Sequence, residues 1–321
     1  MVLNTRQNAT MILVAGSANL DFVVRAQTIP APGETVLGSD FQTFPGGKGA
    51  NQAIACVRAG GAETAMLLAL GDDAFAAPLE ASLREAGVLM HIRRQAHLPT
   101  GTAFICVSSE GENAITVAPG ANSALLPADL PDLQGVSHLV LQLETPLATV
   151  AAYAKAAQAH GVKVVLNAAP AQSLPTDLLH NVDILVVNEG ELAVVSGLDG
   201  NVKQNLERVN VPCVVVTLGG NGSLARVRGS GPNDPDALFR AAPFPIQPVD
   251  TTAAGDTFVG SFVAALARGS RLETALKWGN AAGALACLKP GAQSSIPTVA
   301  EVAAMIQNAG RASAFSPLSP N

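Results

Sequence analysis

The chain has 321 residues, of which 48% are hydrophobic and only 4% aromatic, and it carries a formal net charge of −6 at pH 7. This length suits one large α/β domain with an appendage, and the shortage of aromatic residues disfavours a β-sandwich. An acidic chain without a basic cluster is a poor reader of nucleic-acid phosphates, because such binding is built mainly from Lys and Arg contacts.

Neither a signal peptide nor a membrane span is expected. The first apolar run, Met11 to Ala15, is too short for a signal peptide, and no segment approaches the roughly 20 apolar residues that cross a bilayer. The four cysteines stand far apart, mostly in apolar surroundings, as small core residues do in a reducing compartment. We therefore expect a cytoplasmic protein without a membrane partner.

The first elements predict a buried strand followed by pieces of a smaller sheet. Ile12 to Gly16 is a short apolar run closed by small residues. From Leu20 to about Phe44, and again from Gly101 to Ala118, short alternating segments are separated by turn residues. Alternation of this kind predicts antiparallel strands with one face in water. Both sets are expected to pair into one small sheet, a lid formed by residues 20–45 and 100–118.

The rest of the chain alternates helix and strand, which predicts an α/β fold with a central, mostly parallel sheet and helices on both faces. The expected helices are Ala50–Ala59, Ala74–Ala86, Leu147–His160, Glu189–Val195, Ala254–Ala267, Leu272–Leu288 and Val299–Gln307. The expected strands are Thr64–Leu70, His138–Leu143, Val162–Asn167, Ile184–Val187 and Val211–Thr217. One domain over residues 11–310 follows, with a tail at 311–321 whose Ser and Pro content predicts disorder.

Polar residues at the ends of these strands are the first candidates for a site, because parallel sheets bind ligands at the carboxyl ends of their strands. They are Asn19, Asp21, Glu144, Asn167, Asn188, Glu191, Thr217 and Gly219.

The segment from Gly46 to Ala53 reads Gly-Gly-Lys-Gly-Ala-Asn-Gln-Ala and leads straight into a predicted helix. Paired glycines let the backbone approach a ligand, and a helix N-terminus offers free N–H groups at its positive end. A flexible turn before a helix is the plain alternative, but Lys48 and Asn51 at these spacings favour a binding function.

A second segment, from Asp250 to Phe258, places two carboxylates around a turn of small residues at another helix start. Consecutive N–H groups there can form an anion hole for phosphoryl oxygens. Asp256 in the first helical turn could merely stabilise the helix dipole. It could equally take a proton from a hydroxyl while the turn holds a departing phosphate.

Other nucleotide and hydrolase motifs are absent from the sequence. Neither the P-loop pattern nor G-x-G-x-x-G occurs at these segments, and the five histidines show no metal-ligand spacing. No G-x-S-x-G is present, and Trp278 is expected to pack a helix.

These two glycine-containing segments resemble the two signature segments of the PfkB-type carbohydrate kinases. Asn19-x-Asp21 and the Gln142-Leu143-Glu144 strand end make the chain similar to the ribokinase-like members of that family, from about Met11 to Ile306. The resemblance implies the ribokinase-like fold, in which a central sheet carries a small β-sheet lid.

The resemblance also implies roles for individual residues. It implies that sugar hydroxyls are held by Asn19, Asp21, Gly47, Lys48, Asn51 and Glu144, with Asp256 as catalytic base. It implies an anion hole at Ala253, Ala254 and Gly255, and contacts to ATP from Asn188, Thr217, Gly219, Gly222, Gly255 and Asn280. It implies that Glu191 organises Mg²⁺, and that a monovalent cation (K⁺) lies at Asp250, Thr252, Ala286, Lys289, Gly291 and Ser295.

One departure from the family pattern stands in the anion-hole turn. Ala253 occupies a position where Gly is frequent, and we expect the alanine to present its N–H with a negative φ.

The function implied is an ATP-dependent kinase that phosphorylates the primary 5-hydroxyl of D-ribose and forms homodimers through paired lids. A kinase of the same fold acting on deoxyribose, fructose or a nucleoside is one alternative. A non-catalytic sugar- or nucleotide-binding regulator is another, although a pure binder has no need of the base Asp256.

Overall fold

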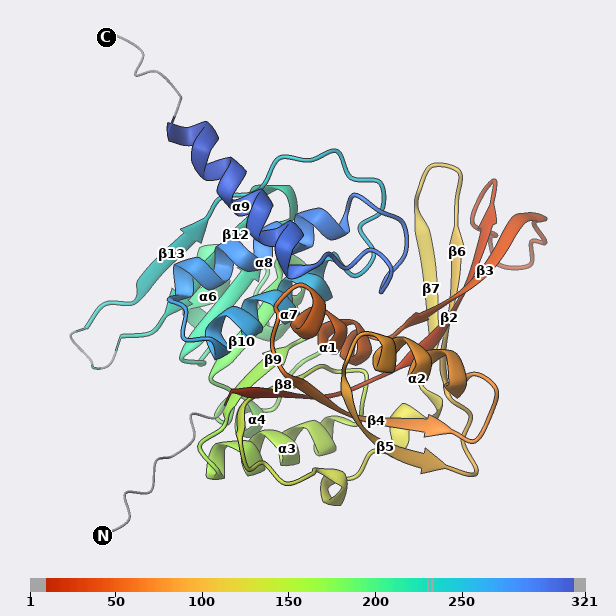
Figure 1. Cartoon of the computed structure of the whole chain (residues 1–321), viewed down its shortest axis with the longest axis horizontal. Helices are drawn as coiled ribbons and strands as arrows, with labels where there is room; N and C mark the ends of the chain where they lie inside the picture. The colour runs from red at the N-terminus through yellow and green to blue at the C-terminus, as the bar shows by residue number, and fades with distance from the viewer. Residues whose placement is uncertain (1–9, 230, 232–233, 315–321) are drawn as a thin grey trace.

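The computed structural model of the chain describes residues 10–229, 231 and 234–314. Within them, nine strands form the main sheet (Figure 1). Their spatial order is β13 (Ala237–Ala241), β12 (Ser223–Val227), β11 (Cys213–Thr217), β10 (Ile184–Asn188), β9 (Lys163–Asn167), β8 (Val136–Leu141), β1 (Met11–Ala15), β4 (Thr64–Gly71) and β5 (Leu89–Gln95). All neighbours from β11 to β5 pair in parallel, whereas β12 and β13 run antiparallel. The predicted mostly parallel sheet is confirmed.

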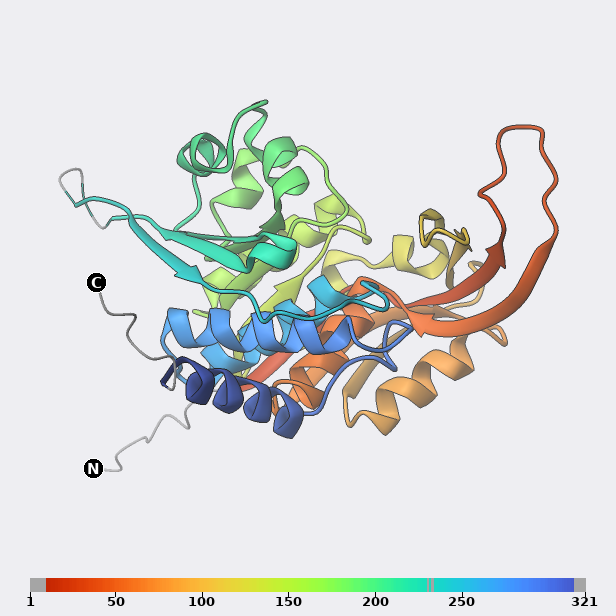
Figure 2. The ribbon, with the colours of Figure 1, turned by 90° about the horizontal axis from the view of Figure 1, so that it is seen from above.

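Each face of this sheet is covered by its own set of helices (Figure 2). One set is α1 (Lys48–Arg58), α2 (Ala76–Glu85), α7 (Ala254–Ala267), α8 (Leu272–Ala286) and α9 (Val299–Ala314), and the other is α3 (Leu147–Ala159), α4 (Thr176–Leu179), α5 (Glu189–Ser196) and α6 (Val202–Arg208).

The alternation of side chains along each strand explains why both faces need cover. In β1, Ile12 and Val14 join the core beneath α1 and α7, whereas Leu13 and Ala15 join the core beneath α3 and α5. Burying each such aliphatic side chain contributes about 1.5 to 3 kcal/mol, so the continuous apolar runs of the central strands drive the layered packing.

A second sheet stands off this body and forms the predicted lid. Within the described residues it has four strands, in the order β3 (Gly38–Gly46), β2 (Asn19–Ala26), β6 (Gly101–Val107) and β7 (Asn113–Ala118). The expectation of purely antiparallel pairing is wrong, because β2 and β6 pair in parallel while the two outer pairs are antiparallel. Since β2 follows β1 and β6 follows β5, both leave the same edge of the main sheet and run outward together.

Several elements were not predicted. Strands β5, β12 and β13 lie at the sheet margins and carry polar or exposed residues, so they lack the apolar run by which the central strands were recognised. Helix α6 is short, and its start is marked by a capping box from Asn201 to Gln204. Residues 27–37 contain no strand, although Thr35 to Gly38 was expected to contribute one.

The C-terminal boundary differs slightly from the expectation. Helix α9 continues to Ala314, past the start of the expected tail at 311, while residues 315–321 lie outside the described part of the chain. Among the described residues, no helix combines the length and apolar character that crossing a membrane requires.

Candidate active site

The polar residues predicted at strand ends gather at the carboxyl edge of the main sheet. Ser17 follows β1 and Glu144 follows β8, while Asn167, Asn188 and Thr217 end three successive strands. The starts of α1 and α7 reach the same edge, where Asn51 Nδ2 donates to Asp256 Oδ2 at 3.0 Å. Residues some two hundred positions apart therefore meet in one place.

The start of α1 is set by Gly47. This glycine has φ 89°, and a Cβ there would lie 2.7 Å from the backbone nitrogen of Asn19. Only glycine accepts both the left-handed conformation and this approach. The cap has no side-chain hydrogen bond, so N–H groups of the first turn remain for other partners, and Lys48 N donates to Glu144 Oε2 at 3.1 Å.

Glu144 is held from two sides. Its Oε2 also accepts a hydrogen bond from Ser17 Oγ, and Ser17 Oγ in turn accepts from Gly49 N at 3.3 Å. These contacts tie the end of β8 to the connection after β1 and to α1. The second carboxylate oxygen can then accept from a ligand hydroxyl.

Asp21 lies beside this group on β2 with 9% of its surface exposed. Burial, together with the negative charges of Glu144 and Asp256, raises the pKa of Asp21 to about 7. The glycine turn makes room for the carboxyl, because a Cβ on Gly46 would come within 2.1 Å of Asp21 Oδ2. Together, the carboxyl groups of Asp21, Glu144 and Asp256 offer several oxygen atoms that can accept hydrogen bonds from hydroxyl groups.

Lys48 balances these acids. The charge of Asp256 raises the pKa of Lys48 above its ordinary value, burial lowers it, and Glu144 and Glu191 raise it again. Its side chain is thus a cation whose pKa responds to the carboxylates of Asp256, Glu144 and Glu191.

Asn19 is buried at the base of the lid. Its Oδ1 accepts from Asn122 Nδ2 at 2.7 Å, and Asn122 also bonds both backbone groups of Ala18. This arrangement fixes the amide of Asn19 so that its Nδ2 donors are the groups left for a ligand.

The anion-hole turn precedes α7 and departs from our expectation. Ala253 adopts φ 56° and ψ 10°, the one non-glycine residue with positive φ among those the structure describes. The expected negative φ is wrong, because Ala253 is the third residue of the turn that the hydrogen bond from Ala254 N to Thr251 O closes, a position at which some β-turns need a positive φ. Left-handed backbone costs an L-residue roughly 1 to 2 kcal/mol.

The turn leaves donors exposed at the helix start. Ala253 has no side chain to cap α7, and Gly255 has open space around its Cα. Ala254 N donates to Thr251 O at 3.2 Å. The N–H groups of Ala253 and Gly255 are the ones placed to meet an anion, as at other uncapped helix N-termini.

A cavity of about 360 Å³ opens directly beside this turn. Its lining includes the predicted nucleotide contacts Thr217, Gly219, Gly222, Gly255 and Asn280. The Asn280 amide donates to Ala241 O and Ala242 O, so it supports the wall of the cavity. Sequence reasoning missed the apolar wall made by Pro243, Phe244, Pro245, Ile246 and Pro248, whose Pro-rich composition resembled an ordinary loop.

Asn188 and Glu191 form a reciprocal capping box at the start of α5, with both hydrogen bonds at 2.8 Å. The pKa of Glu191 lies above its ordinary value, mainly because of burial and also because of the charge of Asp256. The Asn188 N–H and the charge of Lys48 lower the pKa in part. The capping is a sufficient structural reason for this pair, yet Glu191 also faces the charges of the site.

The predicted cation residues come together only in part. Asp250 accepts from Thr252 N and Oγ1 at 2.9 and 2.6 Å, and from Gly291 N at 2.9 Å. Burial raises the pKa of Asp250, but these hydrogen bonds outweigh it and leave the pKa below its usual value. Lys289 Nζ instead pairs with Glu301, Ala286 O accepts from Lys289 N, and Ser295 Oγ donates to Ala292 O.

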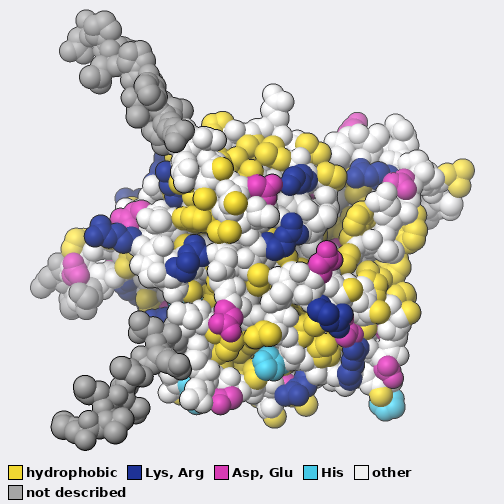
Figure 3. Space-filling view, in the orientation of Figure 1, with side chains coloured by type: hydrophobic (Ala, Val, Ile, Leu, Met, Phe, Trp, Pro, Cys, Tyr) yellow, Lys and Arg dark blue, Asp and Glu magenta, His cyan; other side chains and the backbone are white. Residues whose placement is uncertain are grey.

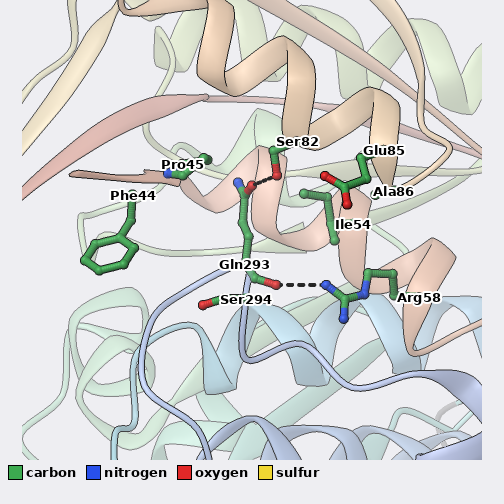
Figure 4. A pocket seen from close by; sticks show the side chains of 9 residues that line it. All are labelled: Phe44, Pro45, Ile54, Arg58, Ser82, Glu85, Ala86, Gln293 and Ser294. Carbon is green, nitrogen blue, oxygen red and sulfur yellow. Dashed lines mark hydrogen bonds between the residues drawn. The ribbon is translucent and has the colours of Figure 1, made fainter. Parts of the chain in front are cut away.

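A second cavity, of about 500 Å³, is separate from these residues (Figure 4). It lies between α1, α2 and the loop that carries Gln293, whose Oε1 accepts from Ser82 Oγ and whose carbonyl accepts from Arg58. None of the site residues predicted from the sequence lines it.

Three buried amides lie behind Asp256, and the sequence predicted no contact between them and this carboxylate; Asn167 was a candidate only as a strand end. The three amides are Gln52, Gln142 and Asn167. The available signal was weak: Gln52 follows Asn51 in the glycine segment, and the other two stand at strand ends.

Comparison with known proteins identifies the family. Residues 9–299 match the sequence pattern of the pfkB family of carbohydrate kinases. The chain belongs to this family. It is therefore a phosphotransferase with an alcohol group as acceptor, as the sequence predicted.

Individual pfkB family relatives match along nearly their whole length. A ribokinase of Haemophilus influenzae is 37% identical over 312 residues, covering 93% of this chain and 99% of the relative. A ribokinase of Bacillus subtilis is 37% identical over 296 residues, covering 91% and 97%. The structure of Arabidopsis thaliana ribokinase complexed with ribose and ATP has a TM-score of 0.84 at 32% identity, covering 93% and 99% of the two chains.

Proposed function

We propose that this chain is an ATP-dependent kinase that phosphorylates the primary 5-hydroxyl of D-ribose, with Asp256 as the general base. The single observation that carries the proposal is the contact between the two helix starts. In this contact the Asp256 carboxylate meets Asn51, one of the side chains proposed to bind sugar hydroxyls, while Ala254 and Gly255 of the preceding turn line the cavity. The names of the relatives support ribose and ATP as the two substrates.

The sugar would lie against Asn19, Asp21, Lys48, Asn51 and Glu144. Asn51 Oδ1 supports this placement, because it is a buried acceptor without a hydrogen-bond partner within the described residues. A free sugar brings several hydroxyl donors to satisfy such acceptors. The groups would hold the ring so that its primary hydroxyl reaches Asp256, and positioning of this kind is worth about 7 to 11 kcal/mol of barrier.

The reaction then needs one proton transfer and one displacement. Asp256 takes the proton of the 5-hydroxyl. At the same time the hydroxyl oxygen bonds to the γ-phosphorus, and the bond from this phosphorus to the bridging oxygen of ADP breaks. The N–H groups at the start of α7 stabilise the negative charge on the transferring oxygens. Mg²⁺, when bound, supplies further charge neutralisation between the phosphates. Glu191 is the carboxylate that would hold this ion, because it is half-buried at the start of α5 and its pKa responds to the charges of Lys48 and Asp256.

A monovalent cation such as K⁺ is part of the same proposal. The loop from Ala286 to Ser295 lies against Asp250, and backbone carbonyls with one carboxylate suit a hard cation. Turnover measured with Na⁺, K⁺ or a bulky organic cation as the sole monovalent ion tests this; equal rates in all three would remove the cation from the proposal.

The lid supports a homodimer. Phe41 and Phe104 expose 62% and 54% of their surfaces on one face of the lid, and Ile115 and Val117 expose 55% and 40% on the other face. Figure 3 shows hydrophobic side chains gathered over the lid. Exposed apolar area of this kind favours a partner surface. Light scattering that returned a mass of 32.5 kDa at micromolar concentration would argue against the dimer.

All four cysteines are free thiols, as expected for a reducing compartment, and this supports the proposed cytoplasmic location. Cell fractionation checks it.

The central test is Asp256→Asn. Loss of a general base should lower kcat by about 10²- to 10⁴-fold, while affinity for ribose stays within a few-fold. Asp177→Asn on α4 is the control, because it removes an exposed carboxylate just before the start of β10, whereas the site lies at the ends of the strands. Retention of most turnover by Asp256→Asn would show that the base is wrongly assigned.

The acceptor is tested separately with a coupled assay for ADP. Ribose, 2-deoxyribose, fructose and a nucleoside are compared at equal concentration, and ribose should give the highest kcat/KM. Strong turnover of a nucleoside with none of ribose would replace the acceptor but leave the kinase chemistry intact.

A further inference from the structure

Behind Asp256, on the side away from the cavity, three buried amide side chains form a chain of hydrogen bonds. We propose that Gln52 is a positioning residue for phosphoryl transfer, which holds the Asp256 carboxylate in its reactive orientation, and that Gln142 and Asn167 fix Gln52 in turn. This inference rests on the proposed function, since it assumes that Asp256 is the base.

Helix α1 provides one hydrogen-bond donor to each carboxylate oxygen of Asp256. Gln52 Nε2 donates to Asp256 Oδ1 at 2.9 Å, and Asn51 Nδ2 donates to Asp256 Oδ2 at 3.0 Å. Each carboxylate oxygen therefore has one fixed donor, so rotation of the group would break at least one charge-assisted hydrogen bond. Each oxygen keeps a further lone pair that can accept from a substrate hydroxyl.

The orientation of the Gln52 amide is itself determined. Gln142 Nε2 donates to Gln52 Oε1 at 2.7 Å, and Gln52 Nε2 donates to Asn167 Oδ1 at 3.0 Å. Asn167 Nδ2 donates to Val186 O at 3.1 Å, which keeps Asn167 Oδ1 facing Gln52. Because a carboxylate only accepts hydrogen bonds, Asp256 determines which group donates and which accepts in each hydrogen bond of this amide network.

Burial makes this chain rigid. Gln52 and Gln142 are 0% exposed, and Asn167 is 8% exposed. In such an environment a reversed amide would leave several polar groups unpaired, at a high cost for each. Gln142 and Asn167 at the sheet edge therefore hold Gln52 in one orientation, and Gln52 in turn holds the Asp256 carboxylate.

The close approach of α7 to α1 makes the contact possible. A Cβ on Gly260, one turn after Asp256, would lie 2.5 Å from Ala55 Cβ and 2.7 Å from Cys56 N. Glycine lets the two helices touch, so that a glutamine on α1 can reach the first turn of α7.

The test replaces the amide with an apolar side chain of similar shape. In Gln52→Met, kcat should fall by about 10- to 100-fold, because a misplacement near 1 Å costs up to two orders of magnitude. KM for ribose should stay within about threefold, because Gln52 contacts the base Asp256. The groups proposed for sugar binding keep their positions in this variant. Gln142→Met, which only frees the Gln52 amide to turn, should give a smaller fall in kcat.

The double variant Gln52→Met/Gln142→Met separates positioning from stability. It removes both partners of the 2.7 Å bond, so the melting temperature should recover relative to Gln52→Met, but kcat should remain low. Asn205→Leu is the control, because it deletes a buried amide on α6, far from the site, and should lower stability without a change in kcat.

Asp256→Asn distinguishes failure of this inference from failure of the proposed function. Placed in that background, Gln52→Met should have little further effect on kcat, as for two residues that act as a unit. If Asp256→Asn abolishes turnover while Gln52→Met stays within twofold of the unmodified enzyme, the positioning role is wrong and the base stands. Recovery of kcat in the double variant, or an equal loss in both backgrounds, would likewise overturn the inference.

Discussion

The two helix starts that meet at the site solve the same problem with different residues. α1 follows Gly47 at φ 89°, and α7 follows Ala253 at φ 56°. Neither cap has a side-chain hydrogen bond, which leaves N–H groups for other partners. Glycine meets the left-handed backbone without strain, whereas alanine stores a cost there.

The surroundings explain why the difference is tolerated. At Gly47 a Cβ would collide with the backbone of Ala18 and Asn19, so no other residue fits. Ala253 is half-buried on the surface of the turn, and its Cβ is accommodated. Gly47 also has ψ 133°, outside the left-handed helical region that Ala253 occupies with ψ 10°. The comparison teaches that close backbone contact and this more extended backbone together enforce glycine, whereas the left-handed helical region alone does not.

The largest effect is expected from Gly47→Ala. The left-handed φ costs about 1 to 2 kcal/mol, and the overlap with Asn19 N adds about 1 to 3 kcal/mol, so the free energy of unfolding should fall by roughly 2 to 5 kcal/mol. Denaturant unfolding measures it. Gly269→Ala is the matched control, because Gly269 has φ 80° with no atom within 4 Å of the added Cβ. Equal losses in both variants would contradict the role assigned to the close contact.

A pH-dependent effect is expected from Asp21, which lies against the glycine turn. Its pKa rises to about 7 on folding, from an ordinary value of 3.8, so the folded state favours the protonated form. The contribution of Asp21 to stability is therefore full below about pH 4 and is lost as the pH rises through 7.

Melting temperature measured across pH 4 to 8 without sugar checks this sign. Asp21→Asn removes the titrating group, so its stability relative to the unmodified protein should increase as the pH rises. A difference that stays constant over this range would show that Asp21 ionises as freely in the folded state as in the unfolded chain.

The smallest effect is expected from Ala253→Gly. Relief of the left-handed backbone, partly offset by the greater entropy of glycine in the unfolded chain, should raise the free energy of unfolding by about 0.5 to 1 kcal/mol. Ala254→Gly is the control, because at a helical position the same change should destabilise by about 0.5 to 1 kcal/mol. Changes of the same sign at both positions would remove the strain assigned to Ala253.

Much of the fold could be predicted because its signals are local. The apolar runs of β9, β10 and β11 and the Ala-rich helices are visible residue by residue. The marginal strands β5, β12 and β13 could not be recognised, because their polar residues are stabilised by neighbours in the sheet. Arg226 in β12 shows this: it is 2% exposed, and its terminal nitrogens donate to Val209 O, Val211 O and Asp236.

For the site, the motif residues could be named from the sequence, but their supporting partners could not. Lys48, Asn51 and Asp256 stand in segments with distinctive spacing. Asn167 could be named only as a strand-end candidate, and nothing local connects it, Gln52 or Gln142 with Asp256 until the fold brings them to hydrogen-bond distance.

By itself, the sequence determined the layered α/β architecture and the two glycine-containing helix starts, because strand burial, helix periodicity and turn chemistry act over a few residues. Only the tertiary structure decided the left-handed backbone of Ala253, the parallel pairing inside the lid and the amide chain behind Asp256. Each of these depends on contacts between segments far apart in the chain, whose geometry no local pattern encodes.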